Sequence, residues 1–393
     1  MHRRNFIQYS AIGTAAFLLS LTKLNSHPAE AFVSTTVSQQ PLYDWIFLYW
    51  MPYDNDLTQW GEPILDMLAK GVQSNNILVI VQSKLWGDKQ LSRHIITSQK
   101  RDSQKLTITN SASEPAFAEY LNWAQSQFQA KKWAIAILGH GGNLDQISPD
   151  DHPLPDNSSG TQWMNIQKLS EAIANFNRQV DRRVELFFFQ NCNKGTIEAN
   201  YTLREAAKYT LSSQFLLGAP NYYYEPLLHF LGHNPEIHGG QLAEKIMEFE
   251  PLTMYQSYTA IDNQAMASLP SKINPVINSI LAANVDSIQT NTLATYDYIG
   301  DRFVDAVTFF DTITTQSKAD REPYNEFIKF LNDSLIYKVQ KQGILMGSRK
   351  RHQNYSGLGI FYPQSKAELE KYQYLPVFSE LKLAELFDAI LVR

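Results

Sequence analysis

Residues 133–142 read WAIAILGHGG, an apolar run that ends in a histidine among glycines. The run Trp133–Leu138 is too short for a helix and too continuous for a half-exposed strand, a pattern typical of strands buried on both faces of a parallel sheet. Three other runs share this pattern: Trp45–Met51, Asn76–Gln82 and Val184–Phe189. We therefore predict four strands of a parallel sheet.

The segments between these runs have helical spacing, namely Leu57–Lys70, Glu114–Gln129 and Ile166–Asn177. Alternating strands and helices predict the α/β class, with a mostly parallel sheet covered by helices on both faces. Leu91–Ser98 and Lys105–Asn110 alternate in polarity and predict a hairpin after the second strand. Further along, the pattern predicts a helix, two strands, a mostly helical region and a late strand that returns to a sheet: Thr196–Tyr209, Leu211–Leu217, Gln256–Ile261, Met266–Gln340 and Gly357–Tyr362.

The first 31 residues have the character of an export signal. Arg3 and Arg4 precede a weakly apolar run, Ala11–Leu21, and residues 29–31 (AEA) supply a small-x-small cleavage pattern. A twin arginine in this position resembles a Tat signal, which exports folded bacterial proteins. The alternative is a retained anchor, although the run is shorter than the ~20 residues that a membrane span needs. We expect an exported, periplasmic or extracellular protein with no stable membrane insertion after signal cleavage, and the sequence leaves its oligomeric state open.

The charge and the missing motifs narrow the function classes. The net charge of −5 at pH 7 is spread along the chain without a basic tract, so nucleic acid is not an expected partner. The chain has no H-E-x-x-H, Walker A or G-x-S-x-G motif, and the spacing of His233 and His238 matches no common zinc site. We therefore expect no metal and no cofactor.

Cys192 is the only cysteine of the chain. Exported proteins usually carry cysteines in disulfide pairs, and a single cysteine cannot form an internal disulfide. One interpretation is a buried small hydrophobe, which is the usual role of a free cysteine. The other interpretation is a nucleophile, which the position of the residue favours.

Cys192 and His140 both follow predicted strands and lie 52 positions apart in the sequence. Sites in open parallel sheets form at the carboxyl ends of the strands, so neighbouring strands would bring both side chains to one crevice. A histidine can take the proton of a thiol with a pKa of ~8.5 and so produce the nucleophilic thiolate. The alternative for His140 is a satisfied core histidine, which fits less well because three glycines flank it.

Two further features are candidates for contact with a substrate. The glycines after His140 leave backbone N–H groups open, and we expect the N–H groups of Gly141 and Cys192 to form an oxyanion hole. Asp54 stands in the triplet Asp54-Asn55-Asp56 after the first strand. The triplet either lines the crevice, with Asp54 contacting the substrate, or caps the following helix.

Several stretches resemble the clostripain family of cysteine peptidases, in the same clan as caspases. They are WIFLYWMPYDNDL (45–57), LNWAQSQFQAKKWAIAILGHGG (121–142), DNSSG with MNIQKLSEAI (156–160 and 164–173), FFFQNCNKGTIEANYTLREAAKYTLSSQ (187–214) and SGLGIFYP (356–363). The resemblance implies a caspase-like three-layer sandwich and peptide-bond hydrolysis by a dyad of His140 and Cys192. We expect a caspase-like catalytic domain over residues 32–262 and a largely helical extension with a late strand, residues 263–393, packed on it.

Two features depart from the family pattern. Members usually carry an acid two positions before the cysteine, linked to a preference for Arg or Lys at the cleavage point, whereas this chain has Gln190. A neutral amide leaves a basic side chain uncompensated in a partly desolvated pocket. Asn143–Gln162, expected as a long surface loop, contains no Lys or Arg at which it could be nicked. We expect Gln190 and Asn191 to contact the substrate, with a P1 preference that is not strictly Arg or Lys.

Three hypotheses remain open at this point. The first is an exported cysteine endopeptidase that acts on protein or peptide substrates through a Cys-His dyad. The second is a catalytically weak or inactive member that binds peptides, suggested by Asn193 and Lys194 in place of the apolar pair usual after the cysteine. The third is an unrelated exported hydrolase whose cysteine is structural.

Overall fold

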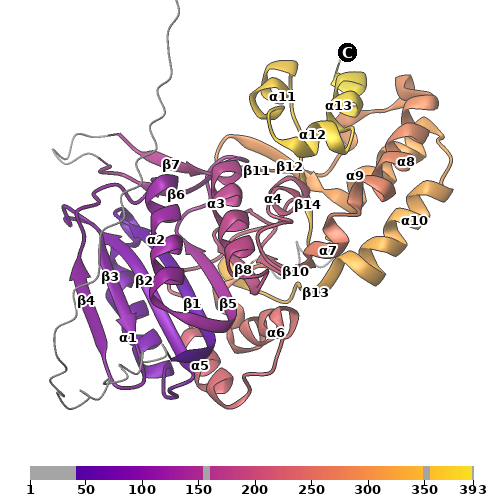
Figure 1. Cartoon of the computed structure of the whole chain (residues 1–393). Helices are drawn as coiled ribbons and strands as arrows, with labels where there is room; N and C mark the ends of the chain where they lie inside the picture. Colours follow the sequence, from indigo (N-terminus) through magenta and orange to yellow (C-terminus); the bar gives the residue numbers. More distant parts are fainter. Residues whose placement is uncertain (1–40, 154–159, 348–354, 392–393) are drawn as a thin grey trace, which may run out of the picture. The chain divides into compact units, whose positions relative to one another are not determined.

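The computed structural model describes residues 41–153, 160–347 and 355–391, which all belong to one compact unit, Gln40–Arg393. Its main feature is a nine-stranded sheet with the order β13-β10-β9-β8-β5-β1-β2-β3-β4 (Figure 1). The parallel strands are β1 (Leu42–Tyr53), β2 (Ile77–Leu85), β5 (Gln129–Leu138), β8 (Val184–Gln190) and β9 (Tyr209–Ser212). The four strands predicted from apolar runs are confirmed, and they are neighbours in the order β8-β5-β1-β2.

Helices cover both faces of this sheet. One face packs against α1 (Gly61–Gly71), α5 (Tyr224–His233) and α6 (Gly239–Phe249), and the other against α2 (Glu114–Gln127) and α3 (Ile166–Gln179). Along β1, Trp45 and Phe47 face the first layer, whereas Ile46 and Leu48 face the second. Because successive side chains of a strand point to opposite faces, a fully apolar run is what a sheet covered twice requires. The predicted three-layer arrangement is confirmed.

The hairpin after β2 is present, but its second strand is not where the pattern predicts it. β3 (Ser92–Ile96) pairs with β4 (Arg101–Lys105), whereas the prediction places this strand at Lys105–Asn110. The five residues of β4 are all exposed and give no apolar signal. The alternating residues after β4 instead contact Leu91 through their backbone, and Leu106 N donates a hydrogen bond to Leu91 O at 2.8 Å. Their apolar side chains therefore mark a loop that packs on the sheet.

β9 is shorter than the predicted strand Leu211–Leu217 and ends at Ser212. The backbone then turns toward the segment that follows β8, where Asn193 N donates to Phe215 O at 2.9 Å. The apolar residues after Ser212 therefore form a wall beside the cysteine loop and do not extend the sheet. The helix predicted over Thr196–Tyr209 is also shorter, because α4 covers Ile197–Thr202 only.

The predicted loop Asn143–Gln162 contains a strand. β6 (Gln146–Asp150) pairs with β7 (Gln162–Asn165) in a separate two-stranded sheet. The strand gives no apolar signal because its buried residues include Ser148 and Asp150, and Ser148 N donates to His140 O at 2.8 Å. The segment therefore folds back onto the histidine loop. Residues 154–159 lie outside the described part of the chain.

The later part of the chain mixes helices and strands. The region predicted as mostly helical holds α7 (Asn263–Met266), α8 (Leu269–Ala282), α9 (Ala306–Ser317) and α10 (Glu322–Phe330), but also β11 (Thr295–Tyr298), β12 (Asp301–Asp305) and β13 (Ile336–Gln340). β13 pairs with β10 (Tyr258–Asp262) at the edge of the main sheet. The late strand is confirmed as β14 (Gly359–Phe361), which joins β11 and β12 in a three-stranded sheet. α11 (Lys366–Tyr372), α12 (Pro376–Glu380) and α13 (Leu383–Leu391) follow, and none of the helices within the described ranges has the length and apolar character of a membrane span.

Candidate active site

The loops after β5 and β8 meet at the carboxyl edge of the sheet. Leu138 is paired with Gln190, so His140 and Cys192 each lie two residues beyond the last paired position. A Cβ atom on Gly141 would lie 2.0 Å from the carbonyl oxygen of Cys192, so the two loops touch through their backbones. The structure therefore brings the predicted nucleophile and the predicted base to one edge, as the spacing indicated.

Asn191 ties these two loops together. Its side chain is 1% exposed, and its Nδ2 donates to Gly139 O at 2.8 Å and to Ser148 Oγ at 3.1 Å. Ser148 Oγ in turn donates to Leu138 O at 2.7 Å. The amide that the sequence suggested as a substrate contact thus holds the histidine loop against the cysteine loop.

The Cys192 sulfur lies against the wall formed after β9. Leu217 N donates to Sγ at 3.3 Å, and Sγ donates to Leu217 O at 3.4 Å. Cys192 is partly exposed, yet burial raises the pKa of its thiol, while the Leu217 N–H, the Tyr298 hydroxyl and the Lys194 charge act in the opposite direction. Burial therefore favours the neutral thiol over the thiolate.

His140 is oriented by a carboxylate that the sequence did not single out. His140 Nε2 lies 2.6 Å from Asp56 Oδ1, and Asp56 is the first residue after the cap Asn55, whose side chain accepts a hydrogen bond from Leu57 N. The His140 side chain is 35% exposed and that of Asp56 is 78% exposed. The only signal for this contact in the sequence was the triplet Asp54-Asn55-Asp56 after β1. Within the triplet, the Asn55 side chain caps the short helix that follows, whereas Asp56 contacts His140.

Asp54 lies below this turn, in a buried ionic network. Its Oδ2 is 2.7 Å from Lys84 Nζ, and Lys84 also lies 3.0 Å from Asp150 of β6. Asp54 Oδ1 accepts a hydrogen bond from His152 Nδ1 at 3.0 Å. Burial raises the pKa of Asp54, whereas Lys84 and His152 lower it. With 1% exposure, Asp54 fixes the end of β1 against β6 and so supports the turn that presents Asp56.

Lys194 binds the backbone of the loop that carries His140. Its side chain is 1% exposed, and Nζ donates to the carbonyl oxygens of residues 142–144, the shortest distance being 2.7 Å to Asn143 O. Burial lowers the pKa of Lys194 to about 7, and Asp145 and Asp301 oppose this shift. The lysine two positions after the cysteine thus fixes the loop that carries His140 through buried hydrogen bonds to its carbonyl groups.

Gly141 offers the backbone groups expected of an oxyanion hole. It forms an antiparallel bridge with Ile147 in which the ladder hydrogen bonds belong to its neighbours, so its own N–H and C=O stay outside the ladder. Its carbonyl accepts a hydrogen bond from the Tyr298 hydroxyl at 2.7 Å. In the part of the chain that the structure describes, neither Gly141 N–H nor Cys192 N–H donates to another residue.

The profile of the clostripain family, peptidase family C11, matches residues 49–385 of the chain. The chain belongs to the clostripain family. It is therefore a cysteine-type peptidase, a hydrolase with the caspase-like fold. The comparison with functionally curated proteins gave no match.

Solved structures of C11 peptidases share the fold of this family member. A secreted C11 cysteine protease from Bacteroides thetaiotaomicron, in complex with an irreversible peptide inhibitor, is 17% identical with a TM-score of 0.64, over 87% of this chain and 99% of that one. An inactive zymogen C11 protease from Parabacteroides distasonis is also 17% identical, with a TM-score of 0.62, over 86% and 98%. The secreted C11 protease called iotapain, from Bacteroides thetaiotaomicron, is 14% identical with a TM-score of 0.65, over 87% and 99%.

Gln190 of this peptidase is fully engaged inside the chain. Its Oε1 accepts a hydrogen bond from the Tyr223 hydroxyl at 2.9 Å, and its Nε2 donates to the Tyr224 hydroxyl. Glu250 is an acid close to the two tyrosines that bind Gln190. It accepts a hydrogen bond from Tyr222 N at 3.2 Å and is 3% exposed. Burial raises the pKa of Glu250 to about 7. Neither side chain presents a free carboxylate next to the cysteine loop.

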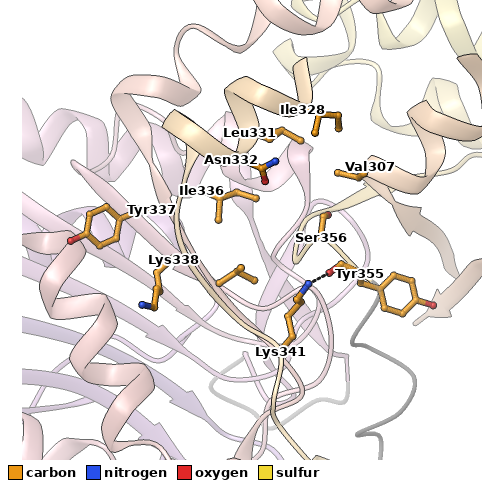
Figure 2. A pocket seen from close by; sticks show the side chains of 11 residues that line it. Val307, Ile328, Leu331, Asn332, Ile336, Tyr337, Lys338, Lys341, Tyr355 and Ser356 are labelled. Atoms are coloured by element: carbon orange, nitrogen blue, oxygen red, sulfur yellow. Dashed lines mark hydrogen bonds between the residues drawn. The ribbon is translucent and has the colours of Figure 1, made fainter. Parts of the chain in front are cut away.

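A separate pocket of about 570 Å³ lies in the later part of the chain (Figure 2). It is lined by Ile328 of α10 and Leu331 directly after it, by Lys338 of β13 and Lys341 directly after it, and by Ser356. None of its lining residues belongs to the cysteine or histidine loop. Within the described residues, no group of three His, Cys, Asp or Glu side chains is arranged to hold a metal ion.

Proposed function

We propose that this peptidase is an exported cysteine endopeptidase that uses Cys192 as nucleophile and His140 as general base. The observation that carries the proposal is the backbone contact of the two loops at the carboxyl ends of β5 and β8, in a chain of the clostripain family. The substrate class is protein or peptide, and the reaction is hydrolysis of a peptide bond.

The chemistry follows from the groups around the sulfur. His140 takes the thiol proton, and Asp56 holds the imidazole and stabilises the imidazolium that forms. The thiolate attacks the scissile carbonyl, and its oxygen becomes negative between the N–H groups of Gly141 and Cys192. His140 then gives its proton to the departing amine. Water attacks the resulting thioester, loses a proton to His140 and releases the acid, which restores the thiol.

The proposal includes a P1 preference that is not restricted to Arg or Lys. Gln190 carries no charge, and both ends of its amide are bound to tyrosine hydroxyls. A basic P1 side chain entering beside it would lose water without gaining a carboxylate, which is costly for a charge. We assign Gln190 and Asn191 to the wall of the P1 site, where their fixed amides shape the pocket. Asp54 supports the neighbouring turn that presents Asp56 to His140.

The proposal also includes export. The first 31 residues carry Arg3, Arg4 and the apolar run of a Tat-type signal, and they lie outside the described residues. The Bacteroides thetaiotaomicron protease with the shared fold is described as secreted. We propose residues 32–262 as the catalytic part and residues 263–393 as an extension packed on it. A fusion of residues 1–40 to a reporter that is active only after export would test the signal, with Arg3→Lys and Arg4→Lys together as the control that should abolish Tat transport.

Covalent labelling tests the assignment of the nucleophile. Iodoacetamide should label Cys192 faster than it labels free cysteine, and His140→Ala should remove this excess rate, whereas the exposed control His229→Ala should not. Cys192→Ala should abolish peptide hydrolysis while the protein stays folded by circular dichroism. A folded protein that labels no faster than free cysteine, or a Cys192→Ala variant that still cleaves peptides, would refute the proposal. A peptide library with a dominant Arg or Lys at P1 would refute the specificity part alone.

A further inference from the structure

We propose that Tyr298 is a further catalytic residue of this peptidase, whose phenol O–H donates a hydrogen bond to the Cys192 sulfur when the sulfur becomes a thiolate. This inference rests on the proposed role of Cys192 and adds a group from the later part of the chain. The sequence carries no signal for it, since Tyr298 is one of 20 tyrosines and follows Cys192 by more than a hundred residues.

Tyr298 reaches the nucleophile from a hairpin. It is the last residue of β11, and a two-residue turn with positive φ at both positions, Ile299 and Gly300, leads into β12. The Tyr298 hydroxyl donates to Gly141 O at 2.7 Å. Gly141 in turn lies against Cys192, because a Cβ placed on it would be 3.4 Å from the Cys192 nitrogen and 2.0 Å from its carbonyl oxygen. The phenol therefore lies at the junction of the two catalytic loops.

The hairpin is held firmly in this position. Asp301, the first residue of β12, is 6% exposed, and its Oδ2 accepts a hydrogen bond from Leu144 N at 2.6 Å. The Tyr372 hydroxyl of α11 donates to the same oxygen at 2.7 Å. The contact of Tyr298 with the cysteine region is thus part of a buried junction that joins the hairpin to the histidine loop.

The Tyr298 hydroxyl also affects the ionisation of the Cys192 thiol. A hydrogen bond donated by this hydroxyl to the ionised sulfur lowers the pKa of the thiol, as do the Leu217 N–H and the Lys194 charge, against the rise that burial causes. Burial raises the pKa of Tyr298, so its phenol stays protonated and can only act as a donor to an anion. Tyr258 on β10 is also affected by the charge of the sulfur, but only through a coulombic interaction and not through a hydrogen bond.

The proposed step moves one hydrogen bond and no additional proton. At rest the single phenolic hydrogen points to Gly141 O. When the thiol proton passes to His140, the sulfur becomes an anion, which is a stronger acceptor than a neutral carbonyl. The O–H then rotates toward Sγ and stabilises the thiolate, while Tyr298 keeps its proton throughout. Lys194 is less suited to this role because its ammonium group is already bound to the carbonyls of residues 142–144.

Tyr298→Phe tests the inference, because it removes the hydroxyl and keeps the ring. We expect the alkylation rate of Cys192 by iodoacetamide at pH 6 to fall on the order of tenfold, with the midpoint of the rate–pH curve about one unit higher. The acidic limb of kcat/KM for a peptide substrate should shift in the same direction. Tyr296→Phe is the matched control on the same strand, since the Tyr296 hydroxyl contacts Gln214 O at 3.4 Å, and its rate–pH curve should match that of the wild type.

Three results would overturn the inference. An unchanged rate–pH curve in folded Tyr298→Phe would mean that the hydroxyl only supports Gly141. A faster reaction would mean that Tyr298 covers the sulfur and inhibits it. If Tyr298→Phe does not fold, Tyr298→Gln keeps a donor without a titratable group, and its curve should lie nearer to the wild type than that of Tyr298→Leu; equal curves would refute the role. Failure of wild-type Cys192 to label above the free-cysteine rate would instead refute the proposed function.

Discussion

Replacing Lys194 by methionine should change how the stability of this peptidase depends on pH. Lys194 is almost fully buried, and its ammonium group donates to the three carbonyls of residues 142–144. Methionine has a similar length and no charge, so the substitution removes the buried cation and leaves these carbonyls without this donor. The second effect costs about 1–3 kcal/mol at every pH. The first effect varies with pH.

The size of the pH effect follows from the pKa of Lys194, which burial lowers from 10.5 to about 7. Between these values the unfolded chain binds more protons than the folded one, so the free energy of unfolding rises with pH. Integrated from pH 6 to pH 9, the gain is about 3 kcal/mol. This is the upper value, because the three carbonyls favour the charged form. Lys194→Met should not show this gain. The free energy of unfolding of the variant minus that of the wild type should therefore be about 3 kcal/mol higher at pH 6 than at pH 9.

Urea unfolding followed by tryptophan fluorescence at pH 6, 7, 8 and 9 measures the effect. The control is Lys366→Met, which removes an exposed lysine at the start of α11 and should run parallel to the wild type. Parallel curves for Lys194→Met and the wild type would refute the reasoning, because they would mean that the buried amine titrates as it does in water. The comparison does not depend on catalysis, so it tests the site's support separately from its chemistry.

Three further predictions concern the same region. Gly141→Ala should lower kcat on the order of a hundredfold, because its Cβ would lie 2.0 Å from the Cys192 oxygen and must displace a catalytic loop; full activity would contradict this contact. Asp56→Asn should lower kcat about tenfold or more with little change in melting temperature, since the Asp56 side chain is 78% exposed and its pair with His140 adds little stability; an unchanged kcat in a peptide assay would remove Asp56 from the mechanism. Burial raises the pKa of Glu250 to about 7, so the free energy of unfolding of the wild type should fall as pH rises through that value. Glu250→Gln has no such carboxyl, and between pH 5 and pH 8 its free energy of unfolding in urea should fall by about 2–3 kcal/mol less than that of the wild type. Equal falls in the two proteins would contradict this prediction.

The centre of the fold could be predicted because its strands face apolar layers on both sides. Such strands leave continuous runs such as Trp133–Leu138 in the sequence. The same reasoning fails at the edges. All residues of β4 are exposed, and β6 buries Ser148 and Asp150, whose side chains are satisfied by hydrogen bonds that only the folded chain supplies. Strands that are stabilised by such contacts carry no periodic signal.

The candidate site likewise contains residues that the sequence indicated and residues that only the fold identified. Spacing at the ends of two buried strands was enough to single out His140 and Cys192. Tyr298 and Lys194 were beyond this reasoning, because their roles depend on which distant backbone groups they meet. The Asp54-Asn55-Asp56 triplet was recognised, but only the geometry assigns the histidine contact to Asp56. Sequence thus indicated the proposed Cys-His pair, whereas the groups that contact it could be identified only from the fold.

The bond between Leu144 N and Asp301 also bears on how the peptidase is made. These residues are 157 positions apart in the chain, so a ribosome must synthesise most of the protein before the histidine loop finds its acceptor. Contacts of such long sequence separation form late, because closing the intervening chain costs entropy before the contact repays it. A nascent or truncated chain that has passed Lys194 but not Asp301 would carry both proposed catalytic residues, with the histidine loop bound to Asn191 and Lys194 but not to the hairpin. The order of synthesis therefore delays this last contact of the histidine loop until Asp301 has been made.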